Sequence, residues 1–381
     1  MSATLKIRPA TAEDTKGLLA LINSTPQPGD ITINFERMPD FFHGARIVTS
    51  TPDIWVMRDE VRDTLAAVFS IGSRPVYVNG ERRDVRYGND LRIHPDYRGG
   101  RSLVRLFKKY REIMEHEWMQ TVILNDNTLS LDTVGSGRAG LPMYYPFGEL
   151  HTQMVFLRQP ITRRVRRPAS GRVQIRRADA TDIPVMQTFF DHEAPLRQFY
   201  PDYRFSDIER DQDYHRDLSI RDFFLAFEDG RLVGMVGVWD QKHFKQTRFV
   251  RYSGSIRWLR PINNLHTRLF GGVNLPPAGN TLNYLMLHCT LITDNRIDIF
   301  EALFDQVFMT CAQASSSTPG MAHCSPQALV CAFTAEDPLQ QVLRKYRRQT
   351  LKSRHFIASY TEDPRPGLDT HRPLYLEAAR I

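Results

Sequence analysis

The first 157 residues alternate between short apolar runs and polar turns, and this pattern predicts a sheet flanked by helices. A short strand at Ile7 leads through an acidic turn into an apolar-periodic helix around residues 18–22. Asn79-Gly80 separates two alternating runs and predicts a hairpin, because this pair supplies the positive φ angles of a type I′ turn. The other predicted elements are strands at 54–57, 65–71, 120–124, 143–147 and 151–157, a returning hairpin strand that ends at Ile93, and helices at 102–117 and shortly after 127.

The second half follows a similar order. A strand at Ile175 and a helix at 183–190 repeat the opening, since Ile175 to Asp182 aligns with Ile7 to Asp14. The remaining predicted elements are a hairpin over 223–239, strands at 283–292 and 328–333, helices at 297–308 and 338–350, and a last strand at 373–377. The repeat predicts two α/β domains, each a mixed, mostly antiparallel twisted sheet flanked by helices.

The domain boundaries are predicted from composition. An Arg/Pro-rich run at 158–172 reads as a linker between a first domain at 1–157 and a second at 173–381. An aromatic and basic segment at 252–281 interrupts the second domain and is predicted to be an insertion, which could cover a cleft or form a dimer contact. A homodimer is therefore compatible with the sequence.

Composition narrows the function classes. The chain has 381 residues, is 41% hydrophobic, and carries a formal net charge of +7. No run of about 18 apolar residues is present, so no membrane span is expected. No apolar signal segment opens the chain and only four cysteines are present, so a cytoplasmic protein with free thiols is expected. The two His-Cys pairs lie in predicted core, and no metal site is expected.

The positive charge suits an anionic ligand. Nucleic acid is the other partner that a basic chain suggests. The basic run at 158–172 lacks interleaved aromatics, however, and no nucleic-acid-binding motif is present, so a solvated linker is the preferred interpretation.

The most informative stretch is Asp90 to Phe107, which reads as a strand, a Pro/Gly/Arg-rich turn and a helix. Such a turn leaves backbone N–H groups unpaired at the helix start, where the helix dipole favours phosphate oxygens. Gly99 and Gly100 would let a ligand approach the backbone closely. The stretch therefore predicts capture of a pyrophosphate-bearing cofactor, the alternative being an ordinary surface junction.

This loop, entered from a strand, resembles the coenzyme A pyrophosphate loop of the GNAT acetyltransferase superfamily. In that family the loop usually runs Arg-Gly-x-Gly-x-Gly or Ala. Arg98 and Gly99 match this pattern, whereas Arg101 and Leu103 stand where small residues are usual. The order of predicted elements resembles the same topology over residues 4–157. In the second half Asp294-Asn295-Arg296 replaces the loop, and Asp294 would repel phosphate, so that site is expected to be degenerate.

The resemblance implies a set of cofactor-binding residues. The strand before the loop would present its backbone to pantetheine and to the thioester carbonyl, and an asparagine after the next strand commonly lies along the cofactor. The implied residues are Leu91, Arg92, Ile93, Arg98, Gly99, Gly100, Arg101, Ser102, Leu103 and Asn127.

The residues that move protons are less defined. Asp90 lies on the strand that would hold the thioester and could act as the base, or it could pair with Arg92 or Arg86. The family's usual acid is a tyrosine seven positions past the asparagine, where this chain has Val134. Tyr144 or Tyr145 could protonate the thiolate instead, or could be core residues.

Together these features predict an N-acetyltransferase. It would move an acyl group from acetyl-CoA, or another acyl-CoA, to a primary amine of a small-molecule or peptide acceptor by direct attack. The alternative is a non-catalytic protein that keeps the fold to sense CoA or another ligand. The sequence does not identify the acceptor.

Overall fold

The computed structural model describes residues 5–27, 31–98, 100–135, 140–159, 173–252, 277–316 and 325–381, together with Gly254 and Asn264. The predicted linker beyond residue 159, most of the predicted insertion, and Gly99 lie outside these residues. The described elements of the first half are β1 (Leu5–Pro9), α1 (Thr15–Ser24), β2 (Ile31–Glu36), α2 (Phe41–Val48), β3 (Ile54–Asp59), β4 (Thr64–Val78), β5 (Glu81–Ile93), α3 (Gly100–Met114), β6 (Met119–Leu124), α4 (Thr128–Gly135) and β7 (Met143–Phe156).

The second half supplies the other elements. They are β8 (Val173–Arg177), α5 (Ile183–Glu193), β9 (Phe223–Glu228), β10 (Arg231–Trp239), β11 (Gln246–Tyr252), β12 (Thr281–Leu282), β13 (Tyr284–Ile292), α7 (Ile297–Ser316), β14 (Ala328–Thr334) and β15 (Arg348–Ser359). Among the described residues, twelve strands form one sheet in the order β1-β3-β4-β5-β6-β15-β7-β14-β13-β10-β9-β8. A small second sheet, β12-β11-β2, joins strands of both halves.

The opening of each half is built in the same way. Arg8 donates to both carboxylate oxygens of Asp14 at 2.7 and 2.8 Å, and Asp14 also accepts the amide of Thr11. Arg176 and Asp182 repeat this arrangement six positions apart, and their contacts measure 2.6 and 2.5 Å. Each carboxylate closes a capping box at the start of the following helix. The sequence repeat is thus a repeat of structure.

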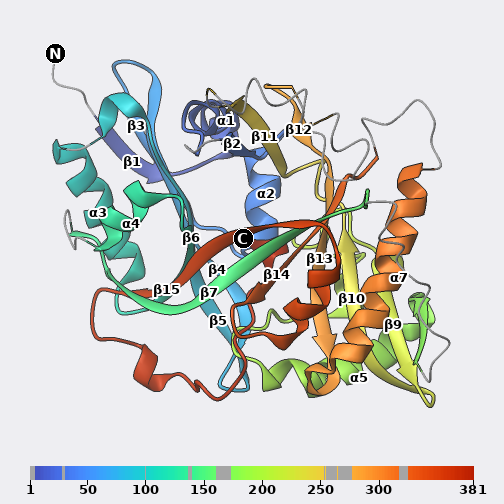
Figure 1. Cartoon of the computed structure of the whole chain (residues 1–381). Coiled ribbons are helices and arrows are strands. Elements are labelled where there is room, and N and C mark those ends of the chain that lie inside the picture. Colours follow the sequence, from blue (N-terminus) through green and yellow to red (C-terminus); the bar gives the residue numbers. More distant parts are fainter. Residues whose placement is uncertain are drawn as a thin grey trace.

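The two halves exchange their last strands. β15, from the second half, lies between β6 and β7, and β7, from the first half, lies between β15 and β14. Figure 1 shows these two long strands crossing the middle of the molecule. Because neither half closes its part of the sheet with its own strands alone, the sheet is continuous from one half to the other. The domain boundaries stay a prediction.

The first part of the sheet is covered on both faces. Leu18, Leu21 and Phe41 of α1 and α2 pack with Val68 of β4 in one apolar cluster. Leu106, Phe107 and Tyr110 of α3 pack with Ala67 and Phe69 in another. Since Val68 and its two neighbours alternate along β4, α3 lies on the face opposite to α1 and α2.

Several predicted elements differ in the structure. The helix predicted at 338–350 is a 3-10 helix, Pro338–Lys345, and the following residues form β15. The predicted last strand at 373–377 makes only an isolated bridge, Gln198↔Leu374. The separate strands at 143–147 and 151–157 are the single strand β7, which continues through Gly148. β2, α2 and β11 were not predicted. None of the described helices is long and apolar enough to cross a membrane.

Candidate acyl-coenzyme A site

The parallel strands β5 and β6 pair over only two positions and then diverge. Arg86 is opposite Met119 and Tyr87 is opposite Gln120, and no pairing follows. β5 nevertheless continues to Ile93, paired with β4 on its other side, and β6 continues to Leu124, paired with β15. Helix α3 begins after the end of β5 and helix α4 after the end of β6. The positive ends of both helix dipoles therefore lie beyond the diverging strands.

The point of divergence is tightly packed. A Cβ atom on Gly88 would lie 2.7 Å from Met119 Sδ and 2.9 Å from the Tyr110 hydroxyl. Tyr110 donates to Met119 Sδ at 3.1 Å. Burial raises the pKa of the Tyr110 phenol and Tyr144 lies close enough to raise it further, so Tyr144 belongs to this group. Burial raises the pKa of the Tyr144 phenol, which makes it a weak acid at neutral pH. Tyr145 points to the other face of β7, where Arg365 lies 5.2 Å from its ring centre.

Beyond Gly88, β5 contains a bulge. Ser70 is opposite Asn89 and Val68 is opposite Arg92, so two residues of β5 face one residue of β4. Asp90 has a φ of 52° in this bulge. After the bulge His94 donates its amide to Ala66 of β4, so by strand alternation Ile93 directs its N–H and C=O groups to the edge that β6 has left.

A cluster of charged groups lies at the bulge. Asp90 Oδ2 accepts from Arg37 Nη2 at 2.6 Å and from Asn89 Nδ2 at 2.9 Å. The sequence also left open a pairing of Asp90 with Arg92 or Arg86. In the structure Arg86 pairs with Glu117, and the ion pair of Asp90 is to Arg37. Arg37 lies over the ring of Phe41 in α2, so Asp90 faces the side of the sheet that α1 and α2 cover.

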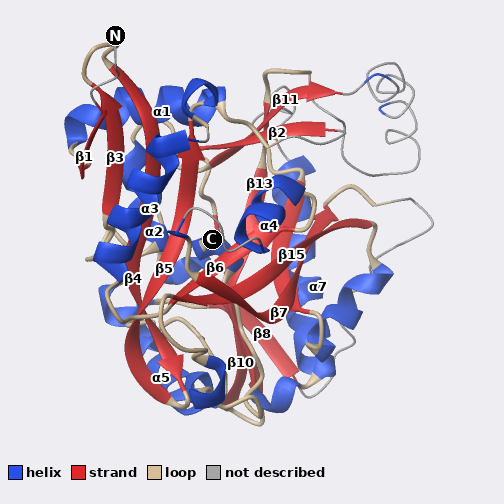
Figure 2. Ribbon diagram, turned by 90° about the vertical axis from the view of Figure 1, so that its left-hand side faces the viewer, coloured by secondary structure: helices blue, strands red, loops and turns tan. Residues whose placement is uncertain are grey.

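Lys245, from the second half, reaches the same cluster. Its Nζ donates to the backbone oxygen of Ile381 at 2.5 Å. Burial is the main cause that lowers the pKa of Lys245 to about 7, with further effects from Arg37 and Asp90. A buried amine in this range exchanges protons near neutral pH. The Ile381 end lies in the middle of the molecule in two perpendicular views (Figures 1 and 2).

The other predicted cofactor residues occupy the loop and helix starts. Asn127 accepts the Ser130 amide and thereby caps α4, while its Nδ2 donates to Gln27 at 3.2 Å. The Arg98 amide already bonds Pro95, and Arg98 Nε lies 3.4 Å from the Ile93 carbonyl oxygen. Gly100 to Leu103 form the first turn of α3. The predicted roles of Leu91, Arg92, Ile93 and the loop residues in binding stay predictions, as do those of Asp90 and the tyrosines.

The corresponding divergence in the second half is filled by protein. The parallel strands β13 and β14 pair only up to Met286↔Val330. Beyond this point the Cys289 amide donates to Glu377 Oε2 at 2.7 Å, and the Thr290 amide donates to the Tyr375 hydroxyl at 3.3 Å. Two side chains of the segment predicted as a last strand, Glu377 and Tyr375, therefore fill this part of β13 among the described residues.

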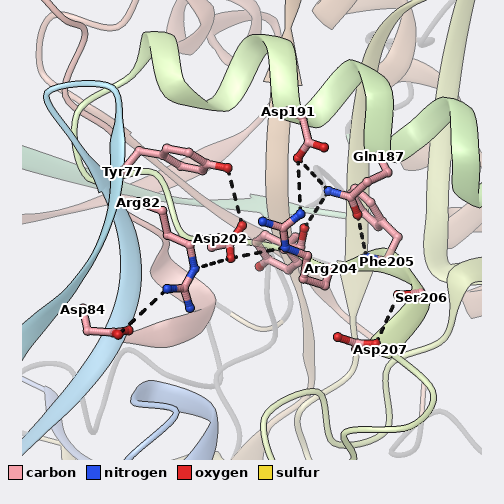
Figure 3. A network of polar contacts seen from close by, with 11 residues as sticks. Tyr77, Arg82, Asp84, Gln187, Asp191, Asp202, Arg204, Phe205, Ser206 and Asp207 are labelled. Carbon is pink, nitrogen blue, oxygen red and sulfur yellow. Dashed lines mark hydrogen bonds and ion pairs between the residues drawn. The ribbon is translucent and has the colours of Figure 1, made fainter.

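The second half also holds the β4–β5 hairpin. Near the end of β4, the Tyr77 amide donates to the Tyr200 carbonyl oxygen at 2.8 Å. The Phe199 amide in turn donates to the Tyr77 carbonyl oxygen at 2.7 Å. Asp202 accepts from Arg82 Nε at 2.8 Å and from the Tyr77 hydroxyl at 3.5 Å, as Figure 3 shows. Since β5 carries the candidate site, these contacts fix the strand from outside its own half.

Sequence reasoning missed Arg37, Lys245 and Tyr110. Arg37 and Lys245 follow elements that the hydrophobic pattern did not predict, and Tyr110 looked like an ordinary core residue of a helix. The spacing of Tyr110 and Phe107 on one helix face gave no sign that the tyrosine hydroxyl would lie at Gly88.

No family model and no curated protein matches the chain. Solved structures do match. The GCN5-related N-acetyltransferase of Sphaerobacter thermophilus has a TM-score of 0.57 at 12% identity, over 94% of this chain and 96% of that one. Saccharomyces cerevisiae N-myristoyltransferase, solved with bound myristoyl-CoA, has a TM-score of 0.57 at 11% identity, over 94% and 78%.

A third match is a GCN5-related glucosamine N-acetyltransferase region in a fungal multi-domain β-N-acetylglucosaminidase. Its TM-score is 0.56 at 11% identity, and this chain spans only 38% of that longer chain. Identities this low establish the fold and not the activity. The chain has the fold of the GCN5-related N-acetyltransferases, as the loop at residues 95–103 suggested.

Proposed function

We propose that the first half binds an acyl-CoA and transfers its acyl group to an amine. The observation that carries the proposal is the divergence of β5 and β6 beyond Tyr87↔Gln120, with a helix starting beyond each strand. The second half offers a comparison within the same chain, because β13 and β14 also diverge there and the space is filled by side chains. Among the described residues, Glu377 and Tyr375 fill the divergence of the second half, whereas the divergence of the first half lies beside the loop that resembles a pyrophosphate site.

The described residues fit an acyl-CoA. Ile93 directs backbone groups to the free edge of β5, where they can bond amide groups of pantetheine and the thioester carbonyl. Asn125 Oδ1, directly after β6, is buried and unpaired among the described residues, and it can accept from an amide N–H of the same arm. The N-terminus of α3 suits the phosphates. When bound, acyl-CoA would supply an activated acyl group.

The chain's own groups would then orient the acceptor and take its proton. The amine must lose a proton to attack, and general bases work best with a pKa near the working pH. Asp90 and Lys245 are the two candidates, and both lie at the bulge of β5. Polarisation of the thioester carbonyl by backbone N–H groups would stabilise the charge that develops during attack.

Two measurements test the proposal. Isothermal titration with acetyl-CoA, octanoyl-CoA and myristoyl-CoA should show binding by at least one of them. Release of free CoA should then depend on added amine. Absence of binding at millimolar concentrations of all three would refute the proposal.

Variants separate the candidate bases. If Lys245 is the base, Lys245→Met should abolish the rise of kcat near pH 7, while Asp90→Asn should retain it. The opposite pattern would assign the proton transfer to Asp90.

A non-catalytic CoA-binding role is the second candidate, because the best-placed polar groups are already occupied. Asp90 is paired with Arg37, and Asn127 caps α4. In this role acyl-CoA would bind without amine-dependent release of CoA across a broad amine panel.

A further inference from the structure

The guanidinium of Arg92 has no hydrogen-bond or ion-pair partner among the described residues. Among the described residues it forms no hydrogen bond and no ion pair of 4 Å or less, and its Nε atom is out of reach of solvent. Burial lowers the pKa of Arg92, and Asp90 opposes this only in part. The side chain is half-buried, with its Nε atom fully buried, and a charge in such a place is costly unless a counter-ion pairs with it.

The four arginines with the most buried side chains each have at least one partner, although Arg37 Nη1 and Arg74 Nε have none. Arg74 donates to Arg380 O and to Gln120 Oε1, at 3.0 and 3.2 Å. Arg197 donates to the carbonyl oxygens of Glu193 and Ile292, at 2.8 and 2.6 Å. Arg37 pairs with Asp90, and Arg380 donates to Ile47 O at 2.9 Å. Against this background, the unpaired state of Arg92 is a specific feature of the bulge.

The surroundings of Arg92 favour an anion. The charged groups that bear on it are Asp90 and Arg37, and these two already neutralise each other in an ion pair. Lys245 adds an amine to the cluster, and this amine is either positively charged or neutral near pH 7. A carboxylate can bind both terminal nitrogens of a guanidinium at once, which gives the strongest pairing available to Arg92.

The position of Arg92 separates this anion from the phosphates of CoA. Arg92 is opposite Val68, whose side chain is buried under α1 and α2. Directly opposed residues of paired strands share a face, so Arg92 emerges on that side. Helix α3 covers the other face. An anion at Arg92 is therefore not the pyrophosphate that the start of α3 would hold.

Resting on the proposed function, we infer that the acceptor is an amino carboxylate, whose carboxylate pairs with Arg92 while its amino group lies towards Asp90. Free amino acids and short ω-amino acids have this chemistry. A peptide N-terminus does not, because its carboxylate is converted to an amide. In the transfer the N–C bond forms, the C–S bond breaks, and the proton lost by the amine ends on the CoA thiol.

The test compares matched acceptors. Glycine, β-alanine and γ-aminobutyrate are assayed against glycinamide, β-alaninamide and methylamine, with release of CoA as the readout. The carboxylates should exceed their matched amides in kcat/KM by about tenfold or more, because a buried charge-assisted pair is lost with the amide. Equal rates for carboxylates and amides would overturn the inference.

Variants locate the effect. Arg92→Met should lose the preference and raise KM for the acceptor, leaving KM for acyl-CoA unchanged. The control is Arg83→Met, at an exposed position of the same strand, which should keep the preference. Because Arg92 has no partner to lose, its replacement should not lower the melting temperature, whereas Arg74→Met should. An Arg92→Met protein with an intact preference would overturn the assignment.

Measuring the binding of the acceptor in the absence of acyl-CoA separates the carboxylate site from the acyl-transfer proposal. Millimolar β-alanine should raise the melting temperature of the wild type and of Arg83→Met but not of Arg92→Met. If this shift occurs while no acyl-CoA binds, the carboxylate site stands and the acyl-transfer proposal fails. If acyl-CoA binds and is turned over with no such shift and no carboxylate preference, the carboxylate site fails alone.

Discussion

Glu377 should be the residue whose loss most clearly shows that the second divergence is closed by protein. Its carboxylate is buried, accepts the Cys289 amide at 2.7 Å and the Tyr375 hydroxyl at 3.0 Å, and lies where a ligand would bind in an open site. Glu377→Ala removes both bonds, together with the longer one of 3.5 Å that the Ala379 amide donates to Oε1. Burial raises the pKa of Glu377, so part of the loss is offset because a costly buried acid is removed as well.

The magnitude follows from the two donors. Cys289 is fully buried, so its amide cannot regain water, and an unsatisfied buried donor costs about 1–3 kcal/mol. The half-buried Tyr375 can recover part of its bond. We expect Glu377→Ala to lower the free energy of unfolding by about 2–4 kcal/mol. Glu377→Gln should cost less, because both bonds are accepted by Oε2 and an amide oxygen in that place keeps them.

Urea unfolding followed by tryptophan fluorescence measures both changes. Glu362→Ala is the control, since Glu362 is an exposed glutamate of the same C-terminal region and should change stability by less than about 0.5 kcal/mol. Amide hydrogen exchange at Cys289 should also accelerate in Glu377→Ala. A Glu377→Ala protein as stable as the control, with a protected Cys289 amide, would refute the reasoning.

Three other changes have defined outcomes. Burial lowers the pKa of His215 to about 2 and of His355 to about 3, so below pH 6.5 the unfolded chain binds protons that the folded chain does not. The contribution of these histidines to the free energy of unfolding should be fully present above pH 6.5. Below that pH it should fall by up to about 1.4 kcal/mol per pH unit for each histidine, and urea midpoints that stay constant from pH 7.5 to 5 would contradict this. Gly88→Val should weaken acyl-CoA binding in titration and destabilise the fold by about 1–3 kcal/mol, because its Cβ would lie 2.7 Å from Met119 Sδ; unchanged binding would move the site elsewhere. Asp202→Ala removes the acceptor shared by a tyrosine and two arginines in Figure 3, and it should lower the unfolding midpoint in urea, whereas an unchanged midpoint would show that the network contributes nothing.

The sequence predicted what depends on local physics. The Asn79-Gly80 hairpin is present, with φ angles of 55° and 88°, and the hairpin at Asp229-Gly230 is present with 49° and 77°. The capped helices at the start of each half and the strand–turn–helix unit ending in α3 are present as well. In each case a turn residue or a cap sets the local conformation before any distant contact forms.

What the sequence did not predict depends on distant partners. β15 has a polar first half, and only its later residues such as Phe356 and Ile357 are buried, so its pattern alone does not mark a strand. Its conformation comes from pairing along both edges with β6 and β7. The ion pair of Asp90 was missed for the same reason, because Arg37 reaches it from a segment whose strand and helix gave weak signals.

The exchange of strands between the halves also affects how the chain can fold during its synthesis on the ribosome. The side chains of Thr350 and Gln153 are hydrogen-bonded although 197 positions separate them. Until residues 348–359 emerge, one edge of β6 and one edge of β7 remain unpaired in the nascent chain, and exposed edges of this kind invite association with other chains. A ribosome stalled before this point would carry a first half whose strand β5 is already made but whose sheet is not yet closed.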